Sequence, residues 1–442
     1  MIKNRSTLVT TEAKRLALDC IERAIHASHP THTVHHSVER SGTKLSVAGE
    51  SFDLSNFEDI LVVGAGKASG RLAESFESKL GEWITDGLII TTEPVETDTI
   101  SIVQGSHPIP SETNVEATEQ ILELLASADE KTLILLLISG GGSSLLCAPA
   151  SPVSLSALQA VNESLLAEGV PIDDINAVRK HLSRVKGGQL ATVADPATSV
   201  GIIMSDVVGD DCAVIASGPT VPDGTTFSDA NAVFDSYGID PPLSVRDRIS
   251  AGVSCTIPET PPPDDTRFDT VTNVVLLDSG KPLRAAASLV RSRGYNPLVL
   301  GSHIRGESRE VAKALVGIAE QIQSTGTPIA PPAVVLTGGE TTVSITGSGT
   351  GGPNHECVVS AGLELPPGIT LAAVDTDGID GSTEMAGGIV DATTFSTTES
   401  ALSALQHNNT GPFLTEHEAA IEMGPTGTNV NDFRVIVIEA EY

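Results

Sequence analysis

The first stretch of the sequence that could bind an anion is LVVGAGKASG, where Gly64, Gly66 and Lys67 follow an apolar run. Glycines let a ligand approach the backbone closely, and an ammonium group beside such a loop suits a phosphate or a carboxylate. The stretch is not a Walker A loop, because Ala68 stands where that motif needs Ser or Thr. Its GxGxxxG spacing would also suit a dinucleotide. A hydride-transfer site and a bare strand–helix turn are therefore the alternatives.

The second stretch is SGGGSSLL, which directly follows the aliphatic run LILLLI. Three consecutive glycines carry an entropic cost, so we expect close contact between the backbone and a ligand. The pattern is not a hydrolase nucleophile elbow, because Leu145 replaces the glycine needed two residues after Ser143. We therefore predict a phosphate cradle whose serines could donate to an oxyanion. Its residues are Ser139, Gly140, Gly141, Gly142, Ser143 and Ser144.

The third stretch, NAVRKHLSRVKGGQLA, gathers four cations in a chain that is otherwise rich in acid: Arg179, Lys180, Arg184 and Lys186. A solvated helix face is the usual explanation for such a run. A local positive excess within a net charge of −31 favours anion binding instead. We therefore expect Arg179 and Lys186 to contact a substrate or phosphate.

Carboxylates that could hold a metal lie in two later motifs. Asp206 and Asp210 follow the apolar run GIIMS, where carboxylates can reach a Mg²⁺ ion or a substrate hydroxyl. Asp377 lies in DTDGIDG, which fails the EF-hand spacing because Ile379 occupies the third ligand position. Acidic turn residues are the alternative for this motif. His107, in SHPIP, is a candidate base or a loop histidine.

The elements that must position these residues alternate between short apolar runs and helical patterns. Strands are predicted near residues 60–63, 87–92, 133–138 and 201–205, and helices near 11–28, 67–80 and 111–127. Strands that are apolar on both faces and are separated by helices indicate a parallel sheet covered on both sides. The predicted fold class is α/β, with an N-terminal doubly wound, Rossmann-like sheet.

The clearest domain boundary is CTIPETPPPDDTRFD, whose consecutive prolines exclude both helix and strand. We therefore predict an N-terminal domain over residues 1–262 and a C-terminal mixed α/β domain over 263–442. Beyond the boundary, strands are expected at 271–277 and 297–301, and helices at 281–293 and 307–323. We expect the active site in a cleft between the two domains.

The composition restricts the partners that the protein can bind. Fifty-seven acidic residues stand against 26 basic ones, and aromatic residues make up 3% of the chain, which disfavours nucleic acids and anionic membranes as partners. Diffuse acidity with little lysine predicts a protein adapted to concentrated salt, with an acidic mesophilic enzyme as the alternative. Five scattered cysteines and the lack of a signal segment predict a soluble cytoplasmic protein.

The motifs taken together resemble the glycerate 2-kinase family, which combines an N-terminal DUF4147-type domain with a C-terminal MOFRL-type domain. Nine blocks carry the resemblance, including VGAGKAS, HPIPSETN, ISGGGSSLL, SDVVGDD, GGETTVSITGSGTGG, DTDGIDGSTEMAGG and GPTGTNVND. Together they span roughly residues 60 to 435. With the acidic composition, the resemblance suggests a member of the haloarchaeal type.

The resemblance implies ATP-dependent phosphorylation of D-glycerate to 2-phosphoglycerate with Mg²⁺ as cofactor, by a monomer or homodimer. Under this hypothesis Lys67, Asp206 and Asp377 are catalytic, and Asp206, Asp210 and Asp377 are candidate Mg²⁺ ligands. Further binding residues in the C-terminal motifs are Gly339, Glu340, Asn354 and Asn429. The alternatives are an NAD(P)-dependent hydroxy-acid oxidoreductase and a non-catalytic protein that binds a phosphorylated metabolite.

One motif departs from the family pattern. The family usually reads GGRNQE where this chain reads GGPNHE, so Pro353 replaces an arginine and His355 replaces a glutamine. An arginine at this position is a natural stabiliser of phosphoryl charge. Its loss must be covered by another cation, for which Arg179, Lys186 and Arg305 are the candidates, or activity is impaired.

Overall fold

The computed structural model describes residues 1–440 and divides them into two compact units. The parallel-sheet unit runs from Thr33 to Leu277, and the mixed-sheet unit combines Met1–His32 with the chain from Asp278 on. The predicted boundary at residue 262 therefore lies too early. The reason is the strand β9 (Val271–Leu277), which pairs in parallel with β8 (Thr198–Met204) and so belongs to the first sheet. None of the helices in residues 1–440 is long and apolar enough to cross a membrane.

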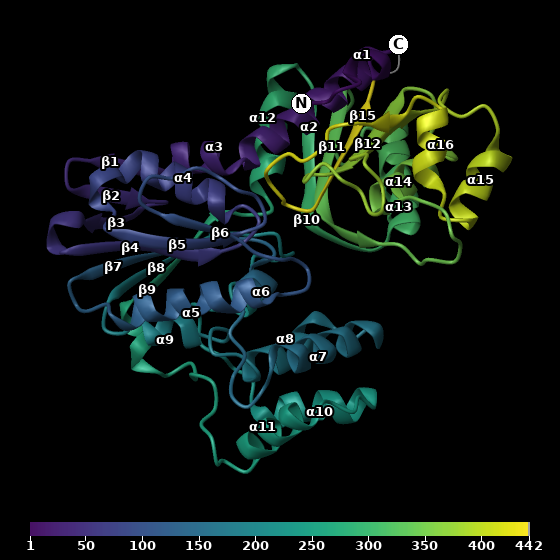
Figure 1. Cartoon of the computed structure of the whole chain (residues 1–442). Coiled ribbons are helices and arrows are strands. Elements are labelled where there is room, and N and C mark those ends of the chain that lie inside the picture. The colour runs from purple at the N-terminus through teal and green to yellow at the C-terminus, as the bar shows by residue number, and fades with distance from the viewer. Residues whose placement is uncertain (441–442) are drawn as a thin grey trace. The chain divides into compact units, whose positions relative to one another are not determined.

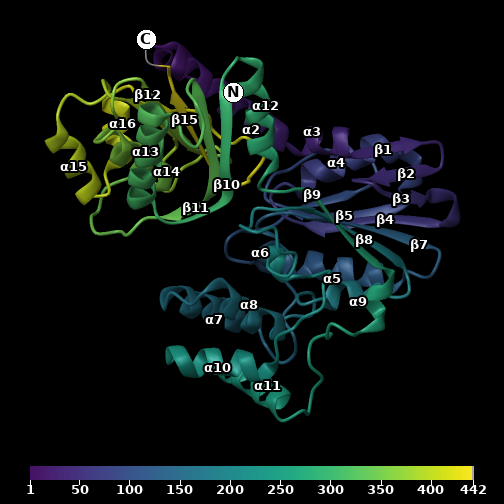
Figure 2. The ribbon, with the colours of Figure 1, turned by 180° about the vertical axis from the view of Figure 1, so that it is seen from behind.

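The parallel-sheet unit contains the predicted doubly wound sheet, with six parallel strands in the order β6-β5-β4-β7-β8-β9. The strands not yet given are β4 (Asp59–Ala65), β5 (Asp86–Thr91), β6 (Ser101–Gln104) and β7 (Thr132–Ile138). Every residue of β7 is buried, as expected for a strand covered on both faces. In Figures 1 and 2, α4 (Ser69–Leu80) covers one face of this sheet, and α5 (Glu112–Ala126) covers the other.

Further elements extend this unit beyond the sheet. The helices α7 (Leu155–Ala167), α8 (Ile172–His181), α10 (Phe227–Tyr237) and α11 (Leu243–Val253) form a bundle with its own apolar core. This core includes Leu158, Val178, Phe227 and Ile249. The remaining elements of the unit include a three-stranded antiparallel sheet of β1 (Val38–Ser41), β2 (Lys44–Val47) and β3 (Glu50–Asp53). Besides α4, α5 and the helices of the bundle, the helices of the parallel-sheet unit are α6 (Gly142–Leu145) and α9 (Gln189–Val193). The boundary between the two units falls within α3 (Pro30–Ser37).

The mixed-sheet unit is built on a second six-stranded sheet, in the order β10-β11-β15-β12-β13-β14. Only β10 and β11 pair in parallel among its described neighbours, and the other pairs are antiparallel. Its strands are β10 (Asn296–Glu307), β11 (Ala333–Thr342), β12 (Ile369–Asp375), β13 (Gly387–Asp391), β14 (Ala420–Ile421) and β15 (Asp432–Ile438). Its helices are α1 (Arg5–Leu8), α2 (Glu12–Ser28), α12 (Lys281–Ser292), α13 (Ser308–Thr325), α14 (Pro353–Gly362), α15 (Thr398–Gln406) and α16 (Thr410–Glu416).

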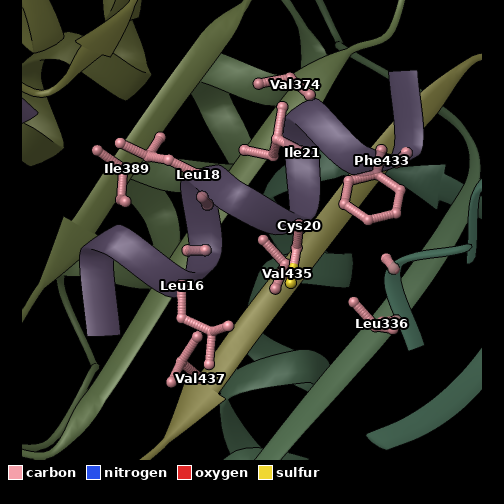
Figure 3. Packing of buried hydrophobic residues seen from close by; sticks show 14 of the residues in the cluster. Leu16, Leu18, Cys20, Ile21, Leu336, Val374, Ile389, Phe433, Val435 and Val437 are labelled. Carbon is pink, nitrogen blue, oxygen red and sulfur yellow. The ribbon is translucent and has the colours of Figure 1, made fainter. Parts of the chain in front are cut away.

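The amphipathic helix predicted near the start of the chain is α2, and it packs on this second sheet (Figure 3). Leu16, Cys20 and Ile21 are buried against strand residues such as Val435 and Phe433. Alternate side chains of β11 point to opposite faces of the sheet. Val334 and Leu336 pack against α2 and α12, whereas Ala333 and Val335 pack against α13 and α14. This packing explains why residues 1–32 belong to the mixed-sheet unit rather than to the predicted N-terminal domain.

Candidate active site

The loops that carry the predicted chemistry meet at the carboxyl edge of the parallel sheet. Lys67 follows β4, Gly140 follows β7 and Asp206 follows β8. The chain passes from β4 outward to β5 and β6, and then returns to place β7 on the other side of β4. A reversal of this kind is the point at which open α/β sheets bind their ligands. The loops that contain Lys67 and Gly140 flank this reversal.

The two loops interlock so closely that their glycines have a packing explanation. A Cβ atom on Gly64 would lie 2.1 Å from the carbonyl oxygen of Leu137, and one on Gly66 would lie 2.1 Å from Ser139 Oγ. Both glycines also have φ values near +150°, which side chains rarely adopt. Gly64, Gly66 and Ser139 therefore hold the β4 and β7 loops together.

The backbone donors of the β4 loop are used within the protein. The Gly66 N–H donates to the Ile90 carbonyl at 3.1 Å, and the Lys67 N–H donates to the Gly140 carbonyl at 2.8 Å. The Ala68 N–H donates to Ser139 Oγ at 3.1 Å. This loop therefore has no free amide at these three positions for the predicted phosphate contact or for a dinucleotide pyrophosphate. The Lys67 side chain is its remaining group for such a contact.

The glycines after β7 make room for polar side chains. A Cβ atom on Gly140 would lie 2.0 Å from Asp206 Oδ2, and one on Gly141 would lie 3.2 Å from both His107 Nε2 and Lys67 Cγ. The structure thus gathers Lys67, His107 and Asp206 around one loop. Two of these are predicted catalytic residues, and the third is the histidine of SHPIP.

The charges in this cluster influence one another. Burial raises the pKa of Asp206, and the Lys67 ammonium opposes that rise. Burial, followed by the positive charge of Lys67, lowers the pKa of His107 to about 4. The imidazole is therefore neutral at pH 7, and one of its ring nitrogens is a hydrogen-bond acceptor.

A cavity of about 540 Å³ lies beside this loop, entirely within the parallel-sheet unit. That volume lies in the range of small-molecule sites. Five lining residues form one stripe along α7 and were not predicted from the sequence, because a helix face with mixed polarity carries no signal for a ligand. They are Leu158, Gln159, Asn162, Glu163 and Leu166. The rest of the lining is His107, Pro108, Ile109, Pro110, Gly141, Ser143, Ser144, Cys147, Arg179 and Lys186.

The four clustered cations separate into two pairs. Lys180 donates to the buried carboxylate of Asp223 at 3.1 Å, and Arg184 forms a surface ion pair with Glu119. Arg179 and Lys186 instead line the cavity, as their predicted binding role requires. Half of the cation run is therefore structural, and half faces a possible ligand.

The guanidinium of Arg179 is held in place by a neutral partner. Its Nε donates to Asn162 Oδ1 at 2.8 Å, and no carboxylate forms an ion pair with it in the described part of the chain. The planar fork of an arginine suits a carboxylate or a phosphate. Arg179 is therefore the best candidate in this cavity for holding the acid group of a ligand.

Lys186 is buried and fixes the glycine loop. Its Nζ donates to the carbonyl oxygens of Ser143 at 2.6 Å and Leu146 at 3.0 Å. Because an ammonium has three donors, one remains after these two bonds. Burial lowers the pKa of Lys186 to about 8, so its charge is sensitive to mildly alkaline pH.

The predicted C-terminal site residues lie in the mixed-sheet unit, where they mostly satisfy one another. Asn354 Nδ2 donates to Asp380 Oδ1 at 3.1 Å and to Asp432 Oδ1 at 2.7 Å. Asp432 also accepts from the backbone and hydroxyl of Thr341 and pairs with the fully buried Arg434. This network stabilises the fold and uses the Asn354 amide nitrogen, whereas the buried Asn354 Oδ1 has no hydrogen-bond partner among the described residues.

The remaining candidates of this unit lie in nearby turns. Asp377 accepts from the Ile379 N–H at 2.9 Å, and Asn429 accepts from the Asn431 N–H at 2.9 Å, both in local turns. Gly339, next to the exposed Glu340, has φ +139°, and a Cβ atom there would lie 2.0 Å from the Ile304 carbonyl oxygen, so both features favour glycine. Burial and the Asp377 charge raise the pKa of the neighbouring Asp375 well above its ordinary range. Nothing in these contacts requires a ligand.

Pro353, the departure from the family motif, begins α14. Proline is favoured at the first position of a helix, where its missing N–H has no partner to lose. The next two amides, of Asn354 and His355, donate to the Asp380 carboxylate at 3.0 and 2.8 Å. The start of α14 is therefore capped by the protein. Of the cations proposed to replace the missing arginine, Arg179 and Lys186 line the cavity of the parallel-sheet unit, and Arg305 lies on β10.

The predicted metal ligands are not gathered into a ready-made metal cage. Among residues 1–440, no group of three or more His, Cys, Asp or Glu side chains is arranged to hold a metal ion. Mg²⁺ usually takes one or two protein carboxylates and completes its shell with phosphates and water. The Asp206 carboxylate lies against Gly140, in the loop that contributes Gly141 and Ser143 to the cavity lining.

Comparison with known proteins identifies the family. A domain of unknown function designated DUF4147 matches residues 16–250, and the MOFRL family matches residues 333–432. A D-glycerate 2-kinase from Thermotoga maritima is 34% identical over 96% of this chain and 98% of its own length. The chain belongs to the glycerate 2-kinase family, which confirms the resemblance carried by its motifs.

Two further similarities are informative. The crystal structure of a glycerate kinase from Thermotoga maritima superposes with a TM-score of 0.84 at 34% identity, covering 96% of this chain and 99% of that one. It supports the two-unit α/β fold. A protein from Agrobacterium vitis named a putative hydroxypyruvate reductase is 40% identical over 86% of this chain and 87% of its own length. That name keeps the oxidoreductase alternative open to test.

Proposed function

We propose that the protein is a glycerate 2-kinase, which transfers the γ-phosphoryl group of ATP to the 2-hydroxyl of D-glycerate. The observation that carries the proposal is the cavity of the parallel-sheet unit, which Arg179 and Lys186 line together with Gly141, the glycine beside which Lys67 and His107 lie. Neither cation forms an ion pair with a carboxylate among residues 1–440, and such cations suit an acid substrate. Family membership supplies the reaction class.

The chain's own groups have separate tasks in this mechanism. Arg179 binds the carboxylate of D-glycerate through its planar fork. Lys67 neutralises the charge that develops on the transferred phosphoryl group, because this reaction asks a protein mainly for positioning and charge stabilisation. The neutral His107 accepts a hydrogen bond from the attacking hydroxyl. The bond from phosphorus to the substrate oxygen forms as the bond to the ADP oxygen breaks, and the hydroxyl proton passes to His107 and from there to water.

The proposal includes Mg²⁺ with ATP. Asp206 is the first candidate ligand for the ion on the parallel-sheet unit, and Asp210 is the second. The ion would neutralise phosphate charge when bound. Asp377 lies in the mixed-sheet unit, and its described contacts are those of a turn. Its roles as a Mg²⁺ ligand and as a catalytic residue stay predictions. Three other expectations also stay predictions: that the protein is a monomer or homodimer, that the active site lies in a cleft between the domains, and that the protein binds no nucleic acid.

The experiment that tests this function measures ADP release from ATP and Mg²⁺ with D-glycerate. ³¹P NMR then identifies the product. Formation of 2-phosphoglycerate supports the kinase. If no ADP forms although circular dichroism shows a folded protein, the kinase is wrong, and the Pro353 departure favours a protein that only binds a phosphorylated metabolite.

The oxidoreductase is the second candidate, because the Agrobacterium vitis relative carries a reductase name. Against it, the amides of Gly66, Lys67 and Ala68 that a dinucleotide would need are bonded within the protein. The test is NAD(P)H absorbance at 340 nm with hydroxypyruvate or D-glycerate. A steady change in absorbance at 340 nm without any nucleoside triphosphate would show that the protein is a reductase.

We also propose that the protein works in the cytoplasm of a cell with a salt-rich interior. The support is the net charge of −31, whose self-repulsion concentrated salt would screen, and five cysteines that are all free thiols. ADP release and thermal unfolding should be compared in about 2 M KCl, where interactions between surface charges are nearly fully screened, and in dilute buffer. Equal activity and stability in both buffers would contradict adaptation to salt.

A further inference from the structure

The hydroxyl of Ser143, which lines the cavity, is the end of a buried chain of hydrogen bonds. Ser143 Oγ lies 2.9 Å from Ser217 Oγ. Ser217 Oγ in turn donates to Asn176 Oδ1 at 2.9 Å. Asn176 is 3% exposed and Ser217 is fully buried, so water cannot replace these partners.

With Asn176 Oδ1 turned toward Ser217, the direction in which each proton of the chain points follows. An amide oxygen can only accept, so the single proton of Ser217 goes to Asn176. The proton between the two serines must then come from Ser143. Ser143 therefore presents lone pairs, and no proton, to a ligand in the cavity.

Its neighbour Ser144 is committed in the same way. Ser144 Oγ donates to the Gly141 carbonyl at 3.2 Å, which leaves it as an acceptor as well. With these bonds neither hydroxyl has a proton free for an oxyanion, in contrast to the sequence-based expectation. A phosphate or carboxylate has no proton to offer them, so this part of the loop suits a hydroxyl group of the ligand instead.

The surrounding backbone is held so that Ser217 cannot easily turn away. Ala216 and Ser217 have φ values of +51° and +63°, a left-handed conformation that costs non-glycine residues about 1 kcal/mol or more each. On the other side, Lys186 holds the carbonyl of Ser143 at 2.6 Å. Strain of this kind persists only where the surrounding structure enforces it, and here it aims one hydroxyl at Ser143.

We propose that Ser143 determines substrate specificity by accepting a hydrogen bond from the hydroxyl of the acid that is not phosphorylated. The inference rests on the proposed kinase function and names its substrate class: 2-hydroxy acids that carry a second hydroxyl. In D-glycerate, with the carboxylate on Arg179 and the 2-hydroxyl reacting, that group is the 3-hydroxyl. An acid with a methyl group there offers Ser143 no proton and leaves a polar oxygen without a partner.

The test compares the binding of D-glycerate with that of D-lactate, which differs only by lacking the 3-hydroxyl. Titration calorimetry gives the dissociation constant of each acid for the full-length protein and for Ser143→Ala. We expect the wild type to bind D-glycerate at least about tenfold more tightly than D-lactate, the factor that one net hydrogen bond supplies. Ser143→Ala should weaken D-glycerate about tenfold and leave D-lactate within roughly twofold.

Three further variants separate specificity from folding. Ser143→Thr keeps the oxygen and should retain the preference. Ser217→Ala releases the proton of Ser143 and should reduce the preference, though less than Ser143→Ala does. The matched control is Ser164→Ala on α7, because Ser164 bonds only to the Ala160 carbonyl of its own helix and should change nothing.

Each outcome decides one question. Equal weakening of both acids by Ser143→Ala, or a wild type that does not bind D-glycerate more tightly than D-lactate, overturns the specificity role. ADP release measured on the same samples reports separately on the kinase. Selective binding without ADP release would leave the role of Ser143 standing and would overturn the proposed function.

Discussion

The two units treat their polar motif residues in opposite ways. In the parallel-sheet unit, Arg179 and Lys186 line a cavity with donors left over after their contacts with the protein. In the mixed-sheet unit, Asp380 caps a helix and Asp432 pairs with Arg434, so the charges are neutralised within the fold. Motifs that look equally functional as sequence thus divide into one set that can bind a ligand and one that mainly holds the structure together. The comparison is testable, because removing a residue should damage binding in the first unit and stability in the second.

The largest effect should come from breaking the network in the mixed-sheet unit. Arg434→Met leaves the Asp432 carboxylate buried without its cation, which typically costs about 3–5 kcal/mol. Denaturant unfolding measures the loss. The control, Arg246→Met, removes a surface ion pair with Asp240 and should cost about 0–1 kcal/mol. Equal losses for the two variants would show that the buried network does not stabilise this unit.

Removing Lys67 should have the largest effect on catalysis. Lys67→Ala takes a cation from the loop that faces His107 and Gly141, so kcat should fall by about 10²–10³ while the fold persists. Initial rates of ADP release and circular dichroism check both parts. Lys131→Ala, which removes an exposed pair with Glu58, is the control. A near-normal kcat for Lys67→Ala would remove this residue from the chemistry.

The two halves of the cation run give a sharper comparison within one unit. Arg179→Met should raise the KM for D-glycerate about 10- to 100-fold, because charge-assisted contacts to a carboxylate contribute about 1.5–3 kcal/mol. The KM for ATP and the value of kcat should change little. Arg184→Met, whose guanidinium pairs with Glu119 at the surface, should leave all three constants unchanged. If both variants behave alike, the cavity does not hold the acid group.

The smallest effect concerns pH. Because burial lowers the pKa of Lys186 to about 8, its ammonium is lost as the pH rises through that value, and kcat/KM should fall by about tenfold per unit above it. His107, with a pKa of about 4, should add no step between pH 6 and 9. Lys186→Arg keeps its charge and should remove the alkaline decline. An unchanged decline in that variant would assign the step to another group.

Much of the fold could be predicted because apolar periodicity is a local signal. Residues 133–138 were expected as a buried strand, and β7 covers Thr132–Ile138; the helix expected near 11–28 is α2, Glu12–Ser28. The domain boundary could not be read in the same way. The proline-rich segment does not mark the end of a domain, because β9, which follows it, still pairs within the first sheet. The helix α2 packs on a sheet whose strands come much later in the sequence. Neither pairing leaves a trace in local sequence.

The site could be predicted only in outline. Glycine-rich stretches marked the right loops, because close approach of backbone requires glycine, but a protein neighbour requires it as much as a ligand does. Gly66 meets Ser139, and Gly140 meets Asp206. The direction of the Ser143 proton depends on Ser217 and Asn176, which are remote from Ser143 in sequence, and the motif that Asn176 opens gives no sign of this contact. Whether a polar group is already satisfied is a property of the folded chain alone.

The division of the chain also sets the order in which its parts can be completed during synthesis on the ribosome. The parallel-sheet unit is continuous, so every strand of its sheet has emerged once Leu277 is free. The helix α2 is made before every strand of either unit, yet the central strand beneath it, β15 (Asp432–Ile438), follows all the other strands in the sequence. The apolar face of α2 must therefore wait, exposed or shielded by a chaperone, while some 400 residues are translated, roughly 20 to 80 seconds at ordinary elongation rates. A helix that is translated early thus belongs to the unit whose sheet is completed later.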